Sequence, residues 1–430
     1  MAVSAGAETG VSTAVRDALC GAALAIVWIA APVGGTSARA EPWIAAHEFS
    51  GNVSIENRWY PEAAAHPGQR AHASGFVAAP RLYLEDAEGR SVTLASFLRY
   101  DAGDPDRTHA DLREAYILLV GEIGDGEWEL RAGIDRVFWG VAESRHLVDI
   151  VNQTDLVEHP NEEAKLGQPM VHVTWSGDWG AAELFGLPYH RARTFPGRRG
   201  RLRSPLVVDN DRAAYESAAG RWHFDFAARY SHGIGPLDLG LSLFDGTSRE
   251  PALIPVAVSG SGPVLMPHYA RIRQLGLDAQ VTTGAWLLKL EAIGRAGARD
   301  RVGRKQDYAA VVAGFEYTLY SVLGFTADLG LLGEWNRDGR GRDATNQFQN
   351  DLFLGARLAL NDVQGTEFLA GVLADADHGT GTLTAEFDRR LSDRWSLHLE
   401  AVALFGVGEA DIAYSTRRDS FMALNLAYSF

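Results

Sequence analysis

Alternation of apolar and polar side chains is the feature that most constrains how this chain folds. From Arg221 the sequence reads RWHFDFAARY, in which every second residue from Trp222 to Tyr230 is apolar and most residues between them are polar or charged. A period of two sends successive side chains to opposite faces of a β-strand. The same alternation returns in the segments that begin at Trp286 and Trp395. The sequence therefore predicts an all-β chain whose strands have one apolar and one polar face.

About eighteen segments carry this alternation. Many are joined by a few turn residues, which favours a meander of antiparallel hairpins. Long polar connections follow others, and short turns at one end with long loops at the other are typical of a transmembrane β-barrel. We predict strands near residues 47–60, 72–88, 91–103, 109–121, 127–139, 168–177, 181–190, 221–232, 236–246, 265–281, 284–296, 306–321, 324–335, 347–361, 364–374, 380–390, 394–407 and 418–430. The predicted long connections are 140–167, 191–220, 247–264, 336–346 and 408–417.

A soluble β-protein is the alternative to a membrane barrel, and two observations argue against it. A soluble sandwich would hide its apolar face in a core, whereas here aromatic residues close off that face near the strand ends, as at membrane interfaces. These aromatic residues are Trp222, Tyr230, Trp286, Trp335, Trp395 and Phe405. The polar face carries charges that we assign to a polar lumen, namely Asp225, Arg229, Lys289, Glu291, Asp328, Arg357, His398 and Glu400. In hydrocarbon every strand edge must be paired, so we predict a closed antiparallel up-and-down barrel of about 16–18 strands.

The first forty residues predict a cleaved signal peptide. Residues 18–32 form an uncharged apolar run that follows Arg16 and precedes a small-residue stretch ending at Ala40. This is the order of a secretory signal, and the run is short for a membrane anchor, which is the alternative. After residue 41 no apolar stretch approaches the ~18 residues of a membrane helix. We therefore expect a signal peptide at 1–40 and a single barrel domain at 41–430.

Composition excludes several other classes of protein. The chain has 40 Lys and Arg against 55 Asp and Glu, a net charge of −15, so most of its surface would repel a phosphate backbone and we expect no nucleic-acid partner. Its one cysteine, Cys20, precedes the predicted mature chain, which excludes a catalytic thiol or a cysteine-ligated metal there. The oxygen-rich segments 336–343 and 375–379 are interpreted as hairpin loops and not as calcium sites. We expect neither a metal nor a cofactor.

The carboxyl-terminal residues resemble a known signal. Phe430 is preceded at alternate positions by Tyr428, Leu426 and Leu424, and this arrangement resembles the insertion signal of Gram-negative outer-membrane proteins. The resemblance implies a bacterial outer-membrane barrel, surrounded by lipid and lipopolysaccharide, in which the barrel-assembly machinery reads Phe430 and Tyr428. The segment RAGIDRVFWGVAESRHLVDIVNQTD, residues 131–155, also resembles a strand-then-loop segment of several uncharacterised channel-like outer-membrane families. That second resemblance transfers no binding residues, and it leaves oligomerisation open.

Two oppositely charged loops are the candidate site. The connection 140–167 is rich in acids, among them Glu143, Asp149, Asp155, Glu158, Glu162 and Glu163. One hairpin later come six arginines, Arg191, Arg193, Arg198, Arg199, Arg201 and Arg203. If both loops fold inward, they form a constriction with a transverse field that selects solutes by charge. The alternatives are surface loops that pair electrostatically, and a plug in which Val148, Ile150 and Val151 pack inside the barrel.

The predicted function is a porin-like channel for passive diffusion of a small hydrophilic or anionic solute. The alternatives are a transporter for a hydrophobic substrate, with Val77 and Phe353 along its path, and a non-conducting structural or docking barrel. An outer-membrane hydrolase is a fourth class, because Ser144, His146 and Asp149 are close in sequence. No G-x-S-x-G motif accompanies them, so we predict that the protein is not an enzyme.

Overall fold

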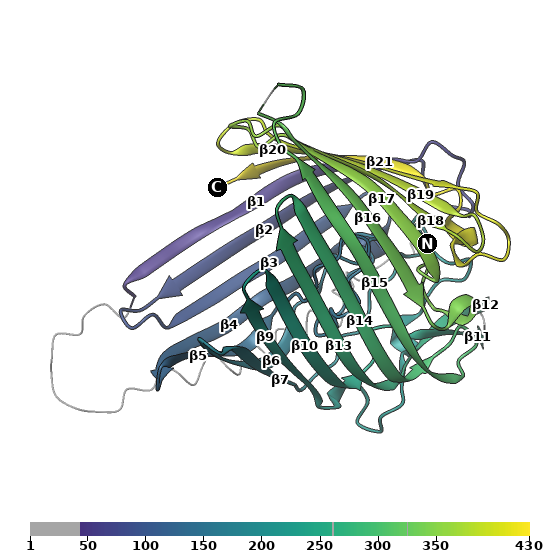
Figure 1. The fold of residues 1–430 in the computed structure, drawn as a ribbon. Helices are drawn as coiled ribbons and strands as arrows, with labels where there is room; N and C mark the ends of the chain where they lie inside the picture. The colour runs from purple at the N-terminus through teal and green to yellow at the C-terminus, as the bar shows by residue number, and fades with distance from the viewer. Residues whose placement is uncertain (1–43, 260–261, 325) are drawn as a thin grey trace, which may run out of the picture.

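The chain forms a closed β-barrel. A computed structural model describes residues 44–259, 262–324 and 326–430, so the predicted signal peptide lies outside the described residues. Eighteen strands make one sheet in which each pairs antiparallel with its neighbours, and the first and last strands of the barrel pair with each other (Figure 1). The strands are β1 (Ala46–Trp59), β2 (His72–Glu85), β3 (Ser91–Asp101), β4 (His109–Ile123), β5 (Gly126–Asp135), β6 (Gln168–Gly177), β7 (Gly180–Leu187), β9 (Asp225–Ile234), β10 (Leu237–Thr247), β13 (Arg271–Thr283), β14 (Trp286–Arg299), β15 (Lys305–Leu319), β16 (Asp328–Asp338), β17 (Asn350–Ala359), β18 (Glu367–Asp375), β19 (Gly381–Arg390), β20 (Trp395–Phe405) and β21 (Phe421–Ser429).

Each predicted strand overlaps one barrel strand, and the fold prediction is confirmed. One prediction was wrong in detail: the segment 265–281 is not a single strand. The chain leaves the barrel before Arg271, and the preceding residues form β12 (Gly262–Tyr269), which pairs antiparallel with β11 (Ala252–Val258) and in parallel with β8 (Ala214–Tyr215). These three short strands form a separate sheet that is not part of the barrel wall. The segment 221–232 also enters the barrel later than predicted, because residues 220–222 form a 3₁₀ turn.

The two ends of the barrel differ. Connections such as 124–125, 178–179 and 284–285 are tight, and we call this end, where the barrel begins and finishes, the turn end. The connections 136–167, 188–224 and 248–270 are long and lie together at the opposite end, the loop end. The predicted asymmetry of the connections is therefore confirmed. Short 3₁₀ turns interrupt the connections, and no helix of the described residues is long and apolar enough to cross a membrane.

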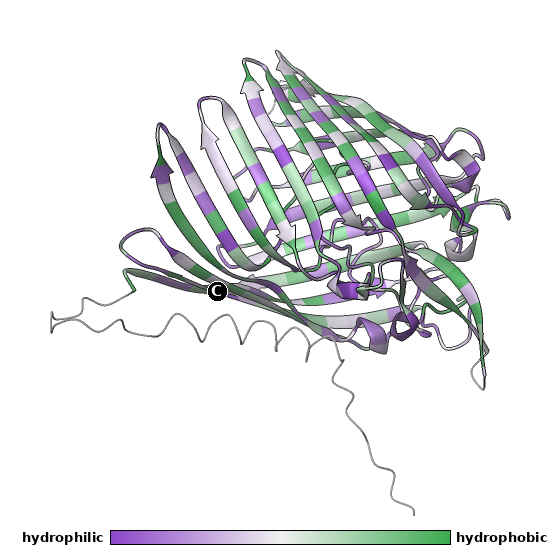
Figure 2. Cartoon of the chain, turned by 90° about the horizontal axis from the view of Figure 1, so that it is seen from below, coloured by the Kyte–Doolittle hydropathy of each residue, from purple (hydrophilic) through white to green (hydrophobic). Residues whose placement is uncertain are grey.

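The outer face of the barrel is an apolar belt. Along β17 the outward Leu352 and Leu354 are 45% and 56% exposed, whereas the inward Asp351 and Phe353 are 3% and 7% exposed. Bands of apolar and polar residues alternate along the strands throughout the sheet (Figure 2). A soluble protein does not leave so large an apolar surface in water, so this belt faces lipid.

The aromatic residues predicted to mark the interfaces lie near both ends of the belt. Trp286 is at the turn end, where its ring lies 4.6 Å from that of Tyr317, and Trp335 is near the loop end. The residues of the predicted insertion signal also lie at the turn end: Phe430 exchanges two backbone hydrogen bonds with Gly51, beside the junction of β21 and β1.

Candidate functional site in the barrel interior

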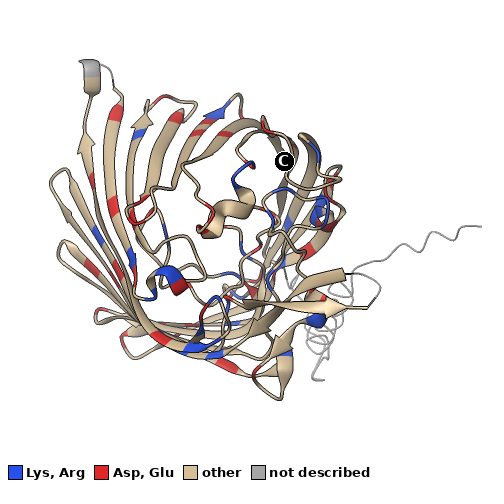
Figure 3. Cartoon of the chain, turned by 90° about the vertical axis from the view of Figure 1, so that its right-hand side faces the viewer, with Lys and Arg blue, Asp and Glu red and all other residues tan. Residues whose placement is uncertain are grey.

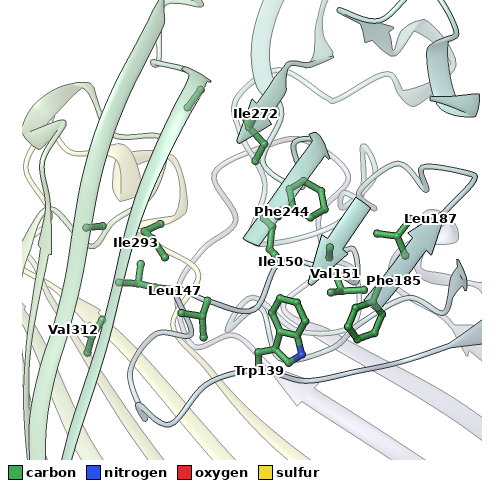
Figure 4. Close-up of a cluster of buried hydrophobic side chains, with 14 of the residues drawn as sticks. Trp139, Leu147, Ile150, Val151, Phe185, Leu187, Phe244, Ile272, Ile293 and Val312 are labelled. Carbon is green, nitrogen blue, oxygen red and sulfur yellow. The ribbon is translucent and has the colours of Figure 1, made fainter. Parts of the chain in front are cut away.

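The connection 136–167 folds into the barrel. It reaches side chains on β4, β14, β16, β17 and β20, which a single loop can do only from the inside. Its apolar residues pack on the inner wall in one core (Figure 4). The loop contributes Trp139, Ala142, Leu147, Val148, Ile150 and Val151, and the wall contributes Met170, Phe185, Leu187, Ala227, Phe244, Ile272, Ile293, Ala298, Tyr308, Ala310 and Val312. Val148, Ile150 and Val151 thus pack inside the barrel, and they fill its β6–β15 side.

Two buried carboxylates of the wall hold the backbone of this loop. Glu291 accepts hydrogen bonds from the backbone N–H groups of Val141 at 2.7 Å and Ala142 at 2.9 Å. Glu334 accepts from the N–H of Glu143 at 2.7 Å and from both the N–H and the hydroxyl of Ser144, at 2.7 and 2.6 Å. Hydrogen bonds to ionised groups are the strong ones, so these contacts fix the loop against β14 and β16.

Gly140 permits the close approach of the loop to Glu291. Its φ is +137°, a backbone conformation that residues with a side chain rarely adopt, and a Cβ there would lie 2.8 Å from Oε1 of Glu291. A larger residue at position 140 would therefore separate the loop from its anchor.

The second half of the loop is held by ion pairs. Asp155 is fully buried and accepts from Arg113 at 2.5 Å and from the hydroxyl of Thr194 at 2.6 Å. Burial alone would raise the pKa of the Asp155 carboxyl, but its contacts with His109 and Arg113 outweigh burial and hold that pKa well below its usual range. Arg249 donates to the carbonyl of Val151 and to Asp225, which ties the loop to β9.

A cavity of about 500 Å³ lies between the loop and the opposite wall. The view from the loop end shows connecting segments with charges of both signs inside the ring of strands (Figure 3). Strands β17–β21 line one side, with Phe353, Leu369, Leu373, Thr382, Thr384, Glu386, Glu400, Val402, Leu404 and Phe421. Loop residues line the other, including Glu143, Arg145, Asp149, Glu162, Glu163, Lys165, Arg193, Arg203 and Phe348.

The six predicted arginines do not form one cluster. Arg191 pairs with Asp111 at 2.6 Å and donates to the carbonyl of Gly167. Arg201 pairs with Asp419 at 2.6 Å, away from the acidic loop. Arg198 and Arg199 are exposed. Of the six, only Arg193 and Arg203 line the cavity. Arg193 reaches Glu162 at 3.2 Å, whereas Arg203 donates to the backbone carbonyls of residues 204 and 205.

The predicted acidic residues also find separate partners. Glu143 lies 2.8 Å from Arg357 and 3.9 Å from Lys289, so it faces the wall and not the arginine loop. Asp149 pairs with Lys165 at 3.0 Å, and Glu158 pairs with Arg99 at 2.6 Å. Most charges of the two loops are therefore neutralised locally.

The predicted lumen-facing residues occupy polar-face positions of the barrel, and most already have partners. Arg229 pairs with Asp278 at 2.8 Å, and Asp225 pairs with Arg249 at 2.9 Å. Asp328 lies at the turn end, where it accepts from the backbone N–H of Ser321. Two residues absent from the predicted set matter more to the interior, namely the loop anchor Glu334 and the cavity residue Glu386. The sequence period of two could have identified both residues, because it places them on the polar face of their strands.

The predicted hydrolase residues do not form a triad. The Ser144 hydroxyl donates to Glu334 and accepts from Asn336, and Asp149 pairs with Lys165. The ring of His146 lies edge-on against that of Phe138, with centroids 4.8 Å apart. In the described part of the chain, no hydrogen bond joins Ser144 to His146.

Two groups of residues in the described ranges have the spacing of metal ligands. One is His109, Asp155 and Glu158, and the other is Asp375, His378 and Asp411. In the first group both carboxylates are already bound to arginine, which opposes a cation. In the second, Asp375 binds His378 at 2.9 Å and Asp411 accepts from Thr380 at 2.7 Å. Neither group is assigned a metal.

No protein-family profile and no curated protein matches this sequence. Solved structures do: OpdQ of Pseudomonas aeruginosa has a TM-score of 0.50 at 10% identity, over 89% of this chain and 97% of OpdQ. OpdO of the same organism gives 0.49 at 11% identity, over 90% and 97% of the two chains. A mutant porin of Rh. blastica gives 0.43 at 11% identity, over 90% and 100%. The likeness to OpdQ establishes the fold, a porin-like β-barrel of the outer-membrane type.

Proposed function

We propose that this protein is an outer-membrane channel for passive diffusion of small solutes, without catalytic activity. The observation that supports it best is the union of a closed barrel, an apolar belt and a charged interior that keeps a cavity of about 500 Å³ beside an inward loop. A polar lumen is what lets water and small hydrophilic solutes through a barrel of this size.

The inward loop is the proposed constriction. Its charged residues Glu143, Asp149 and Glu162 line the cavity together with Arg193 and Arg203, and these side chains would set the field that a solute meets. We expect Arg191, Arg198, Arg199 and Arg201 to contribute little, because they do not line the cavity. Asp155 and Glu158 have a supporting role in this proposal, since their ion pairs hold the loop in place.

Outer-membrane lipid and lipopolysaccharide would surround the belt, and the barrel-assembly machinery would recognise Phe430 and Tyr428 during insertion. These partners are proposed on the exposure of the belt and on the resemblance of the carboxyl-terminal residues to an insertion signal. Oligomerisation is left open.

The test is single-channel recording of the detergent-folded protein in a planar bilayer, with reversal potentials measured in a salt gradient. We expect discrete conducting steps with a defined charge preference. A barrel that is folded, as judged by heat-modifiable migration on a gel, but that never conducts would refute the proposal and favour a docking barrel.

Replacing Arg203 with Ala should change the reversal potential, whereas replacing the exposed Arg198 and Arg199 together should not. The opposite result would place the selective charges outside the cavity.

A further inference from the structure

The inner wall formed by β17–β20 is apolar at one level of the barrel. Phe353, Leu373, Thr382 and Leu404 are consecutive cross-strand partners, so they form a row across the four strands, and all four line the cavity. The next row towards the turn end is Gly355, Gly371, Thr384 and Val402. Water-filled pores need no such surface, so this apolar wall suggests contact with the hydrocarbon part of a solute.

Two glycines shape this wall around the ring of Phe353. A Cβ on Gly371 would lie 2.4 Å from Cε2 of Phe353, and a Cβ on Gly355 would lie 3.0 Å from its Cζ. The ring of Phe353 therefore lies over Gly355 of β17 and Gly371 of β18, in space that side chains at either position would occupy. The result is an aromatic platform beside the cavity.

Two carboxylates lie directly opposite each other one row further. Glu386 and Glu400 are cross-strand partners, and both line the cavity. Like charges in this position destabilise a sheet. A cation bound in the cavity next to both carboxylates would offset that repulsion.

The two carboxylates differ in their partners, because only Glu400 is bound by His159. The Nδ1 of His159 accepts a hydrogen bond from the backbone N–H of Asn161, and its Nε2 lies 2.8 Å from Glu400. Glu386 has no hydrogen bond or ion pair among the described residues.

Carboxylates outnumber cationic side chains on this wall. The polar-face positions of β17–β20 hold six carboxylates, Asp351, Glu367, Asp375, Glu386, Asp388 and Glu400, against the two guanidinium groups of Arg357 and Arg390. Across the cavity, Lys165 pairs with Asp149, Arg193 with Glu162 and Arg295 with Glu250. Arg145 lies 3.6 Å from Asp338, which also binds Arg340, and Arg203 donates to backbone carbonyls. In the described part of the chain neither forms an ion pair with Glu386 or Glu400.

We propose that the solute of this channel is an amphipathic cation, with its apolar part on the Phe353 platform and its cationic group at Glu386 and Glu400. The proposal rests on the proposed channel function and replaces the anionic solute expected from the arginine count. The ring of Phe353 lies over Gly355 and Gly371, in the row next to the carboxylate pair. Adjacent rows are about 7 Å apart along a strand, which is within the reach of one small molecule that carries an aromatic ring and an ammonium group.

The experiment measures block of the single-channel current by three probes: benzyltrimethylammonium, tetramethylammonium and benzoate. We expect the first to half-block at a concentration about tenfold below that of each of the others, since it alone uses both the platform and the carboxylates. E386Q should weaken block by both ammonium probes about tenfold. F353A and G371A should remove only the advantage of the benzyl group.

Matched controls are E129Q, which removes a carboxylate on β5 outside the cavity lining, and F368A, which removes a lipid-facing ring of β18. Neither should change block. A conducting channel that benzoate blocks best, or in which E386Q acts like E129Q, would overturn the inference and leave the channel function standing. A folded barrel without conductance would refute both.

Discussion

Replacement of Glu334 by Gln tests whether wall carboxylates hold the inward loop. The carboxylate of Glu334 accepts three hydrogen bonds, from the N–H of Glu143 and from the N–H and hydroxyl of Ser144. Glutamine has one acceptor oxygen, and its amide group would point a donor at a buried N–H. The side chain is nearly isosteric, so the packing of the loop is otherwise unchanged.

The size of the effect follows from the bonds lost. A hydrogen bond to an ionised group contributes about 1.5–3 kcal/mol, and E334Q removes one or two of them. A loss of about 3 kcal/mol in the free energy of loop opening corresponds to roughly 100-fold more frequent opening. Hydrogen exchange of the backbone amides at 141–148, followed by mass spectrometry, should therefore speed up by about that factor while the barrel strands stay protected.

The control is E316Q. Glu316 also faces the lumen, but it lies 4.0 Å from Lys289 and 3.7 Å from Arg357 and accepts no bond from the loop backbone. Its substitution should leave exchange at 141–148 unchanged. Equal exchange in E334Q and the wild-type protein would refute the anchoring role. Equal acceleration in E316Q would attribute the effect to lumen charge and not to hydrogen bonding.

Further substitutions test other parts of the interior. D155N should cost about 3 kcal/mol at pH 7, measured by urea unfolding with tryptophan fluorescence. Because the folded-state pKa of Asp155 is depressed, the ionised form stabilises above the ordinary aspartate pKa, and the difference between wild type and D155N should shrink below about pH 4. D225A leaves Arg249 buried without its carboxylate and should cost about 3–5 kcal/mol in the same assay. F430A should lower the fraction of heat-modifiable, assembled barrel, and an unchanged fraction would contradict the insertion-signal role. Charge selectivity should weaken in 1 M salt, where the Debye length is about 3 Å.

The strands could be predicted because lipid imposes a strict rule on them. The outer face must be apolar around the whole circumference, so every barrel strand has a sequence period of two. A strand such as the one that begins at Trp286 can therefore be recognised from its own sequence, without knowledge of its neighbours. The predicted strand 265–281 is the exception, because only its part from Arg271 onward lies in the barrel. Pro263 and Pro267 lie in β12, the strand that precedes this part and is outside the barrel sheet. Proline cannot donate to a neighbouring strand, and that signal was available in the sequence.

The contacts of the interior could not be predicted in the same way. Closure of the barrel determines which side chains, distant in the sequence, become neighbours in the lumen. Glu334 lies 190 residues from Ser144, and Glu400 lies 241 residues from His159. The position of a charged residue on the polar face of a strand indicates only that its side chain points inward. Whether it anchors a loop, pairs with a neighbour or faces the cavity depends on which strands lie opposite the loop, and the alternation carries no record of that.

For the same reason, a count of arginines does not by itself give the sign of the field in the lumen. Counting charges treats each as free, but a guanidinium with a buried carboxylate partner, such as Arg201 with Asp419, contributes little field to the lumen. A solute responds to the net charge that remains after the ion pairs of the lumen have been subtracted. On the β17–β20 wall we propose that this remaining charge is negative, because Glu386 and Glu400 lie directly opposite each other and no ion pair among the described residues involves Glu386. The selectivity of a barrel is therefore set by its unpaired side chains, and their identification requires the paired ones to be placed first.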